Sequence, residues 1–292
     1  TATPALHTTQ IFGNPVYNYS YRDAVIDGYL VDYDAPHIIK TELNQNGIHH
    51  EKGESLARYN PVTKELLNPE ELEDELDFDV EEFNKNVLTP SFNEVALAEI
   101  AKHIDPESEE KVVIFAVNDR HADEIVRVLR KIYEEQDVPS NAIEKITCSI
   151  GDRKRVQDAI KRFKNEHYPT IAVTVDLLST GIDVPEITKI VFMRRIKSRI
   201  LYEQMLGRAT RLCPKINKTH FDIYDAVDLY SYLDEFSSMK PVVSNPSVTF
   251  DELFKGYEKV EDEEHIKFIN DQIIAKLQRV KRHMDETQIN YF

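Results

Sequence analysis

Short apolar runs alternate with amphipathic segments through the middle of this chain. The runs are rich in β-branched residues, as expected of strands buried on both faces of a sheet. Between them, apolar side chains recur every three or four residues, the period of a helix that packs on one side. Strands are predicted over residues 112–117, 143–149, 170–175, 189–193 and 221–224. Helices are predicted around residues 122–133 and 156–163, and from about 198 to 211.

This alternation predicts parallel strands joined by right-handed helical crossovers. The fold class is therefore α/β, with a mostly parallel sheet flanked by helices, over roughly residues 90–236. Asn118 and Asp119 follow the first strand and are good residues to begin a helix.

The segments on either side of this domain have other patterns. Residues 38–43 and 48–59, separated by Asn44-Gln45-Asn46-Gly47, predict a β-hairpin insertion. An acidic run over 70–82 is most simply a solvated face or a linker. After residue 237 the chain is expected to be helical. One apolar stripe there is expected to pack on the rest of the protein, with a partner-binding helix as the less favoured interpretation. The stripe consists of Ile266, Ile269, Ile273, Leu277, Val280 and Met284.

The charge of the chain is unevenly distributed. Among 292 residues, 52 are acidic and 36 are basic, a formal net charge of -16. Taken whole, that charge argues against a general nucleic-acid-binding protein, because phosphates are held by clustered Lys and Arg. Residues 1–110 have a net charge of -16, residues 111–218 of +7 and residues 219–292 of -7. The predicted α/β domain is thus basic within an acidic protein, and a nucleic-acid surface there remains open.

Composition excludes several other classes of protein. Hydrophobic residues make up 41% of the chain, which is enough for a sizeable core. No apolar stretch approaches the roughly 20 residues that a membrane-spanning helix needs, so no membrane association is expected. The only cysteines are Cys148 and Cys213, which fits a cytoplasmic location and excludes a Cys-based zinc site. No residue of the chain is expected to bind a metal.

The most specific segment is Gln204-Met205-Leu206-Gly207-Arg208-Ala209-Thr210-Arg211. On a helix, Arg208 and Arg211 would project to one side, with Gln204 one turn earlier. Two convergent guanidinium groups suit a polyphosphate. The alternative is a pair of surface arginines. Gly207 argues against it, because glycine within a helix costs about 1 kcal/mol and commonly marks a close approach.

A second segment, residues 176–185, leaves the predicted strand 170–175 at its carboxyl end, where ligand loops of parallel sheets lie. Gly181 permits a tight turn, Thr180 supplies a hydroxyl and Asp183 a carboxylate. These groups suit contacts to phosphate and ribose. An ordinary connection between strand and helix is an equally good interpretation of this segment taken alone.

Together the two segments resemble motifs V and VI of the superfamily 2 helicases and translocases. Residues 113–118 lie where the motif IV strand of that family would be, and Thr1-Ala2-Thr3-Pro4 resembles motif III. The run Phe12-Gly13-Asn14-Pro15-Val16-Tyr17-Asn18-Tyr19-Ser20, followed by Asp23-Ala24-Val25 and Asp27-Gly28-Tyr29-Leu30, is similar to the restriction (motor) subunit of type I restriction-modification systems.

The resemblance implies a division of the chain. Residues 1–40 would be a remnant of the first RecA-like lobe and 41–89 the hairpin and acidic insertion. Residues 90–236 would form the second RecA-like motor lobe and 237–292 a helical C-terminal region. No glycine is followed by lysine, so the chain has no phosphate loop, and no Asp-Glu-Ala-Asp or Asp-Glu-x-His segment occurs. The chain is therefore expected to be a fragment that alone does not hydrolyse ATP and lacks the nuclease domain of the family.

The resemblance also implies roles for single residues. Arg208 and Arg211 would be catalytic arginine fingers, and Gln204 would set nucleotide geometry. Thr180, Gly181 and Asp183 would contact the cofactor, which would be ATP with Mg²⁺ held mainly by the first lobe. Thr1 and Thr3 would couple hydrolysis to DNA movement.

The densest basic cluster lies just before the arginine motif. It consists of Arg194, Arg195, Lys197 and Arg199. With Arg153, Lys154 and Arg155 it could follow a DNA backbone independently of sequence, although ordinary surface ion pairs are the alternative.

The sequence therefore predicts part of an ATP-dependent double-stranded DNA translocase. Its expected partners are double-stranded DNA and the methyltransferase and specificity subunits of the same system. An excision-repair type of helicase and a non-catalytic module that docks a partner subunit are the alternatives.

Overall fold

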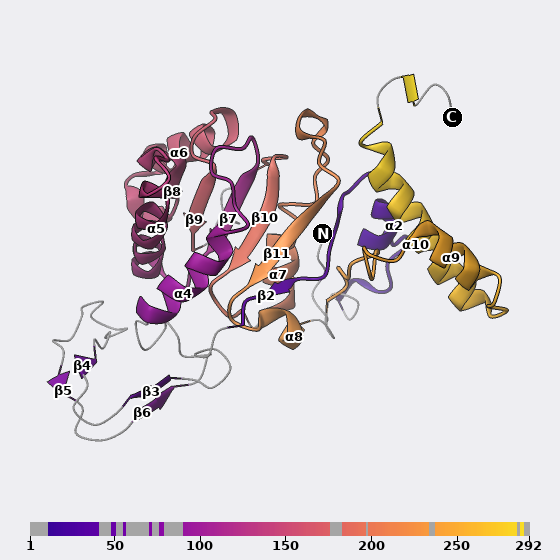
Figure 1. Ribbon diagram of the computed structural model, residues 1–292, viewed down its shortest axis with the longest axis horizontal. Coiled ribbons are helices and arrows are strands. Elements are labelled where there is room, and N and C mark those ends of the chain that lie inside the picture. The colour runs from indigo at the N-terminus through magenta and orange to yellow at the C-terminus, as the bar shows by residue number, and fades with distance from the viewer. Residues whose placement is uncertain are drawn as a thin grey trace.

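Parallel strands form the centre of the computed structural model (Figure 1). The structure describes residues 11–40, 90–175, 183–196, 198–233, 237–284 and 287–288, and the backbone of four short strands between 48 and 78. The main sheet has the order β1-β11-β10-β7-β9-β8, with β2 also paired to β11, and each of its pairs is parallel. Its strands are β1 (Asp32–Tyr33), β2 (His37–Ile38), β7 (Lys111–Phe115), β8 (Ile143–Lys145), β9 (Ile171–Thr174), β10 (Ile187–Phe192) and β11 (His220–Asp225).

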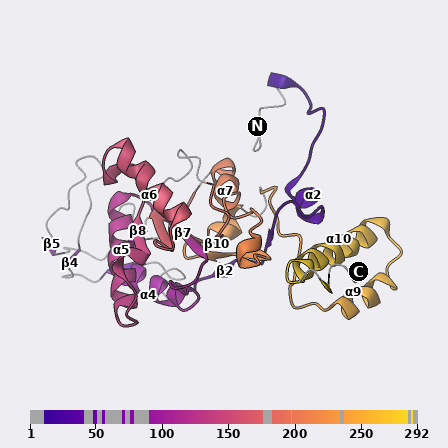
Figure 2. The same cartoon turned by 90° about the horizontal axis from the view of Figure 1, so that it is seen from above.

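Helices cover both faces of the sheet, which confirms the predicted α/β class. Helices α4 and α5 lie on one face, and α6 and α7 lie on the other (Figure 2). Apolar side chains alternate along β7 between these layers, and all five of its residues are buried. The helices of this domain are α4 (Pro90–Ala101), α5 (Asp119–Glu134), α6 (Arg153–Asn165), α7 (Arg199–Leu206) and α8 (Leu229–Leu233), with 3-10 turns η2 (Ser140–Ala142), η3 (Cys148–Ile150) and η5 (Pro214–Ile216).

Two predicted elements are shorter than their sequence patterns indicate. The strand predicted over 143–149 ends at Lys145, because Cys148–Ile150 turn into η3 before α6 begins. The helix predicted to reach Arg211 ends at Leu206, with Gly207 as its C-cap residue. The apolar period continued past the true end, because Ala209 is buried although it lies in the turn that follows the helix.

The predicted hairpin is wrong in its pairing. Strand β3 (Ile48–His50) pairs antiparallel with β6 (Leu76–Phe78), and β4 (Ser55–Leu56) pairs with β5 (Glu70–Glu71). Residue 38, predicted to begin the first hairpin strand, instead belongs to β2 and pairs with β11. The Asn44–Gly47 turn lies outside the described residues. Local turn chemistry suggested neighbouring partners, whereas the partner of β3 comes from the acidic run.

The beginning and the end of the chain pack against each other. Helix α2 (Tyr21–Ile26) contacts α10 (Glu263–Lys281), where Arg22 forms an ion pair with Asp271 at 2.7 Å. Val25, Val242, Val243 and Ala275 form a small core of their own. Strands β1 and β2 also belong to the main sheet. Residues 21–38 therefore pack with the second lobe, although the boundary predicted at residue 40 placed them in the first.

The C-terminal stripe packs as predicted only in part, with Ile266, Ile269, Ile273 and Met284 half-buried. Helix α9 (Phe250–Tyr257) lies beside α10, and Ile269 approaches Gly256. Leu277 and Val280, however, are 50% and 41% exposed. The buried positions of α10 are instead Asp271, Gln272 and Ala275, so hydrogen bonds contribute much of its contact with the rest of the chain. Apolar periodicity marked the helix correctly but identified only part of its buried face.

A buried histidine of α5 leads to a pH prediction. The Nδ1 of His121 accepts the N–H of Val117 at 3.2 Å, and its Nε2 lies 3.2 Å from Oδ1 of Asn93. Burial lowers the pKa of His121 to about 3. Since this pKa lies below the ordinary value of about 6.5, the neutral ring favours the folded state, and that stability is lost as the pH falls from about 6.5 toward 3. We expect this group to lower the free energy of unfolding by about 2 kcal/mol between pH 7 and pH 5.

Urea unfolding of the wild type and of His121→Asn at both pH values measures this contribution. Asparagine offers an acceptor in place of Nδ1 but does not titrate. Between pH 7 and pH 5 the free energy of unfolding should therefore fall less in His121→Asn than in the wild type, by about 2 kcal/mol. An equal loss in both proteins would show that His121 does not contribute.

Candidate nucleotide and nucleic-acid site

The arginine motif begins on the last turn of α7 and continues beyond it. Ser198 caps the helix by accepting the N–H of Leu201, and Gly207 ends it. A Cβ on Gly207 would lie 3.2 Å from the carbonyl oxygen of Glu203, so glycine permits the turn to remain tight. Arg208 and Arg211 therefore lie after α7 and not, as predicted, on its face. Their relative position is set by this turn.

The structure brings one residue of each predicted segment together. Nε of Arg211 lies 3.3 Å from Oδ1 of Asp183, and both side chains are about half exposed. An exposed ion pair of this kind contributes no more than about 1 kcal/mol, so a charged ligand could displace it at little cost. Gln204 is exposed on α7, and Arg208 is partly buried, lining a small apolar space beside Met205.

This pair lies at the edge of the sheet where the parallel strands begin. Pro185, two residues after Asp183, accepts a hydrogen bond from Nζ of Lys218 just before β11. The backbone carbonyl of Glu186 accepts the N–H of Lys111 at the start of β7. The backbone carbonyl of Thr210 accepts the N–H of Val31, the residue before β1. The expectation that the second segment presents its ligand groups at the carboxyl edge thus does not hold for Asp183, because the chain has already returned to begin β10.

Two buried lysines fix this amino edge. Nζ of Lys111 donates to the carbonyl oxygens of Glu166, His167 and Pro169 at 2.6 to 2.8 Å. Burial lowers the pKa of Lys111 to about 8 and that of Lys218 to about 7. Both ammonium groups are directed at backbone carbonyls, so their function is to hold the starts of the strands.

Arg194 and Arg195 of the predicted basic cluster lie at the opposite, carboxyl edge. Nη1 of Arg194 donates to the carbonyl oxygen of Val175 at 3.0 Å, which connects the ends of β10 and β9. Nε of Arg195 donates to the carbonyl of Val227, beyond β11, at 2.8 Å. These arginines tie strand ends together, and each is only partly exposed.

Arg199 reveals a residue that the sequence analysis missed. Its Nη1 donates to Glu203 at 2.8 Å, and the Glu203 carboxylate is 4% exposed. The other carboxylate oxygen accepts the backbone N–H of Ser238 at 2.7 Å and its hydroxyl at 2.9 Å. Glu203 thus fixes α7 to the segment after α8. The i, i+4 spacing of Arg199 and Glu203 was the available signal.

The N-terminus of α6 presents the most accessible cations at the carboxyl edge. Arg153, Lys154 and Arg155 are all exposed, directly after the N-cap residue Asp152. No ion pair within the described part of the chain involves them. The helix N-terminus adds partial positive charge to theirs, a combination that favours phosphate oxygens.

Several predicted site residues lie outside the described residues. They are Thr1, Thr3, Thr180, Gly181 and Lys197. Their roles remain predictions from the sequence.

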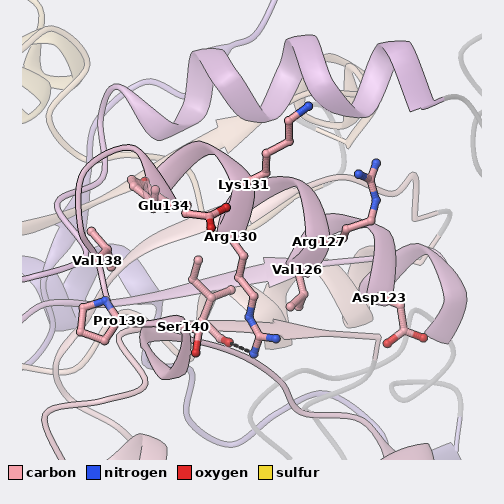
Figure 3. Close-up of a pocket in the computed structure, with 11 residues that line it drawn as sticks. Asp123, Val126, Arg127, Arg130, Lys131, Glu134, Val138, Pro139 and Ser140 are labelled. Carbon is pink, nitrogen blue, oxygen red and sulfur yellow. Dashed lines mark hydrogen bonds between the residues drawn. The ribbon is translucent and has the colours of Figure 1, made fainter.

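The surface hollow drawn in Figure 3 is lined neither by the arginine motif nor by the start of α6. It has a volume of about 530 Å³ and lies between α5 and the segment before β8. Its arginines already have partners. Nη2 of Arg127 lies 2.6 Å from Glu124, and Nη2 of Arg130 donates to the carbonyl of Ile143 at 2.9 Å. No convergent polar set marks it as a reaction site.

Comparison with known proteins identifies the family of the central domain. Residues 95–213 match the helicase conserved C-terminal domain, a range that includes β7 to β10, α7 and both arginines. Residues 95–213 therefore belong to the helicase C-terminal domain family, the second RecA-like lobe of the superfamily 2 helicases and translocases.

Within that superfamily the chain is a homologue of type I restriction enzyme subunits. It is 45% identical to the EcoKI endonuclease subunit of Escherichia coli (strain K12), over 96% of this chain and 25% of that protein. It is 26% identical to the Escherichia coli EcoAI endonuclease subunit, over 77% of this chain and 27% of that protein. The chain thus spans about a quarter of the length of these relatives. A fragment of an HsdR subunit from Vibrio vulnificus YJ016 has the same fold, with a TM-score of 0.57 over 82% of this chain and 41% of that one, at 22% identity.

None of the described helices combines the length and the apolar character needed to cross a membrane.

Proposed function

We propose that this chain is part of the ATP-dependent double-stranded DNA translocase motor of a type I restriction enzyme, acting in the cytoplasm. The observation that carries the proposal is the meeting of Asp183 and Arg211 at an exposed edge of the lobe. A guanidinium group there suits the phosphates of a nucleotide, and a carboxylate suits its ribose.

The nucleotide would be ATP with Mg²⁺, held mainly by a phosphate loop in another segment of the protein. Arg208 and Arg211 would approach the γ-phosphate when the two lobes close, and Gln204 would orient the nucleotide. Thr180 and Gly181 would contact the nucleotide from the preceding loop, while Thr1 and Thr3 would couple hydrolysis to movement. Mg²⁺ would neutralise charge on the β- and γ-phosphates during transfer. Closure and reopening would move the protein along DNA.

DNA would be held along the carboxyl edge of the sheet. The exposed cations at the start of α6 are the strongest support, because Arg194 and Arg195 are partly engaged in holding strand ends. Lys197 and Arg199 would contribute charge nearby. Nucleotide and DNA would therefore occupy opposite edges of one rigid sheet, which suits a motor that converts lobe closure into displacement.

The methyltransferase and specificity subunits of the same system would be the protein partners. Exposed apolar side chains on α9 and α10 support an interaction surface in the C-terminal region. Phe254 is 54% exposed and Leu277 is 50% exposed.

Salt-dependent DNA binding tests the nucleic-acid part of this proposal. A labelled duplex titrated with the 292-residue chain should bind less tightly as salt rises, since each phosphate contact releases counterions. Three contacts through Arg153, Lys154 and Arg155 correspond to a loss of about 40-fold between about 50 mM and 200 mM salt. Replacing all three with alanine should remove most of that dependence.

A matched control is the double variant Lys161→Ala/Lys164→Ala, because these exposed lysines lie near the other end of the same helix. It should keep the salt dependence of the wild type. Binding that is insensitive to salt, or equally weakened in both variants, would count against a DNA surface at the start of α6.

A further inference from the structure

A cluster of histidine and aspartate side chains lies where β1 and β2 pair with β11. His220 and Asp222 are two residues apart on β11, so they project from the same face of the sheet. Strands β1 and β2 both run parallel beside β11, and the short connection between them carries Asp34. The register, with Asp32 opposite His220 and Tyr224 opposite His37, brings residues from both segments together.

The donor atoms of three residues converge. One ligand atom each from Asp34, His220 and Asp222 lie within 4.8 Å of one another. Nε2 of His220 is 3.6 Å from Oδ1 of Asp222 and 3.9 Å from Oδ2 of Asp34. Ligands about 2.0 to 2.2 Å from a tetrahedral ion are separated by roughly 3.3 to 3.6 Å. Small side-chain rotations would therefore bring all three to an ion between them.

Neighbouring groups orient these donors. Nδ1 of His220 lies 2.8 Å from the hydroxyl of Thr219, which holds the ring with Nε2 toward the carboxylates. Oδ1 of Asp34 accepts Nη1 of Arg279 at 2.5 Å, leaving Oδ2 on the side of His220. Histidine ligands in metal sites commonly have their second nitrogen bonded in this way.

We propose that Asp34, His220 and Asp222 bind one divalent transition-metal ion, of the series from Mn²⁺ to Zn²⁺. An imidazole with two carboxylates suits these ions, whereas Mg²⁺ is bound by oxygen ligands. His37, whose Nε2 is 4.0 Å from Oδ1 of Asp222, lies close enough to supply a fourth ligand directly or through water. The site is distinct from the one where ATP and its Mg²⁺ would bind.

Such an ion would join the edge strands to the C-terminal helix. Asp34 would contact the ion through one oxygen and Arg279 of α10 through the other. The ion would thereby fix β1, β11 and α10 together, and its stabilisation of the chain would rise with the logarithm of one plus the ratio of ion concentration to dissociation constant.

Calorimetric titration of the chelator-treated 292-residue chain with Zn²⁺ tests the proposal. We expect one bound ion per chain and a rise in the temperature of unfolding on addition of Zn²⁺. Asp222→Asn and His220→Ala should each lower the affinity by about 10-fold or more. Co²⁺ in place of Zn²⁺ should give visible absorption typical of a site with nitrogen and oxygen ligands, and that absorption should be lost in the same variants.

The matched control is His265→Ala. His265 forms an exposed pair with Asp262, whose Oδ2 is 2.7 Å from its Nδ1, but it lies apart from the cluster. This variant should bind Zn²⁺ as the wild type does. Urea unfolding without metal establishes that the Asp222→Asn chain is folded. The proposal would be overturned if the wild type bound no ion, or if Asp222→Asn and His220→Ala bound Zn²⁺ with unchanged affinity.

Discussion

Replacing Arg208 with alanine in a full-length protein that contains this segment is expected to lower DNA-stimulated ATP hydrolysis by about 10³-fold or more. An arginine that completes the γ-phosphate site acts on charge that develops only in the transition state, so its loss affects turnover directly. DNA affinity should be almost unchanged, because Arg208 is partly buried beside Met205 and lies away from the exposed cations of α6. Steady-state ATPase assays and duplex titration measure the two effects separately.

Lys215→Ala provides the matched control for this variant. Lys215 is an exposed cation that follows the same motif and pairs with Glu109 at 3.0 Å. Its removal should alter turnover little, because an exposed ion pair contributes no more than about 1 kcal/mol. Near-normal turnover in Arg208→Ala, or an equal loss in both variants, would contradict the assignment of Arg208 as an arginine finger.

A second large effect, on the docking of α10, is expected when Asp32 is replaced. This residue connects β1 to the C-terminal region. Its carboxylate is 1% exposed and accepts the backbone N–H groups of Val242 at 3.0 Å and Val243 at 2.8 Å. Tyr21 and Arg279 donate to it as well, at 3.2 and 3.3 Å. Burial raises the pKa of Asp32, and the two backbone hydrogen bonds oppose that change.

Asp32→Ala would leave these donors buried without their acceptor. We expect a loss of about 3 to 5 kcal/mol in the free energy that docks α10, because removing one partner of a buried charged network leaves the others uncompensated. Hydrogen exchange should report the loss as faster exchange over residues 263–281. Exchange in β7, β9 and β10 should change much less, since their core lies elsewhere.

Asp262→Ala is the comparison that separates docking from helix stability. Asp262 is exposed and caps α10 by accepting the N–H of His265, so its removal should cost only about 1 kcal/mol. If α10 exchanged no faster in Asp32→Ala than in Asp262→Ala, Asp32 would not be the docking residue that the structure indicates.

Periodicity predicted the α/β layers well, because each central strand is a continuous apolar run with few alternatives. Residues 111–115 and 171–174 are buried on both sides wherever their helices lie, so local sequence is enough to identify them. Apolar periodicity was less reliable in predicting where an element ends. Apolar residues after Gly207 continued the helical pattern although the backbone had turned. The buried face of α10 was identified only in part, since its most buried positions include the polar Asp271 and Gln272.

The residues of the candidate site could likewise be predicted from the sequence, but not their placement in the fold. Gln204, Arg208, Arg211 and Asp183 could be proposed from two short segments, because each segment contains its candidate residues within ten positions. Their placement at the amino edge of the sheet was not predictable, since it depends on where the loop before β10 returns. The cluster of Asp34, His220 and Asp222 gave no signal in the sequence, because nearly 190 residues separate its two parts.

The sequence by itself determined the family, the positions of the central parallel strands and the motif that contains Arg208 and Arg211. These depend on local pattern and on residues close along the chain. Tertiary structure alone decided which strand lies beside β11, which face of α10 is buried and which carboxylate meets Arg211. Those outcomes depend on burial and hydrogen bonding between distant segments, which no local period encodes. Asp32 is the clearest case, because its partners at 242 and 243 lie 210 and 211 residues further along the chain.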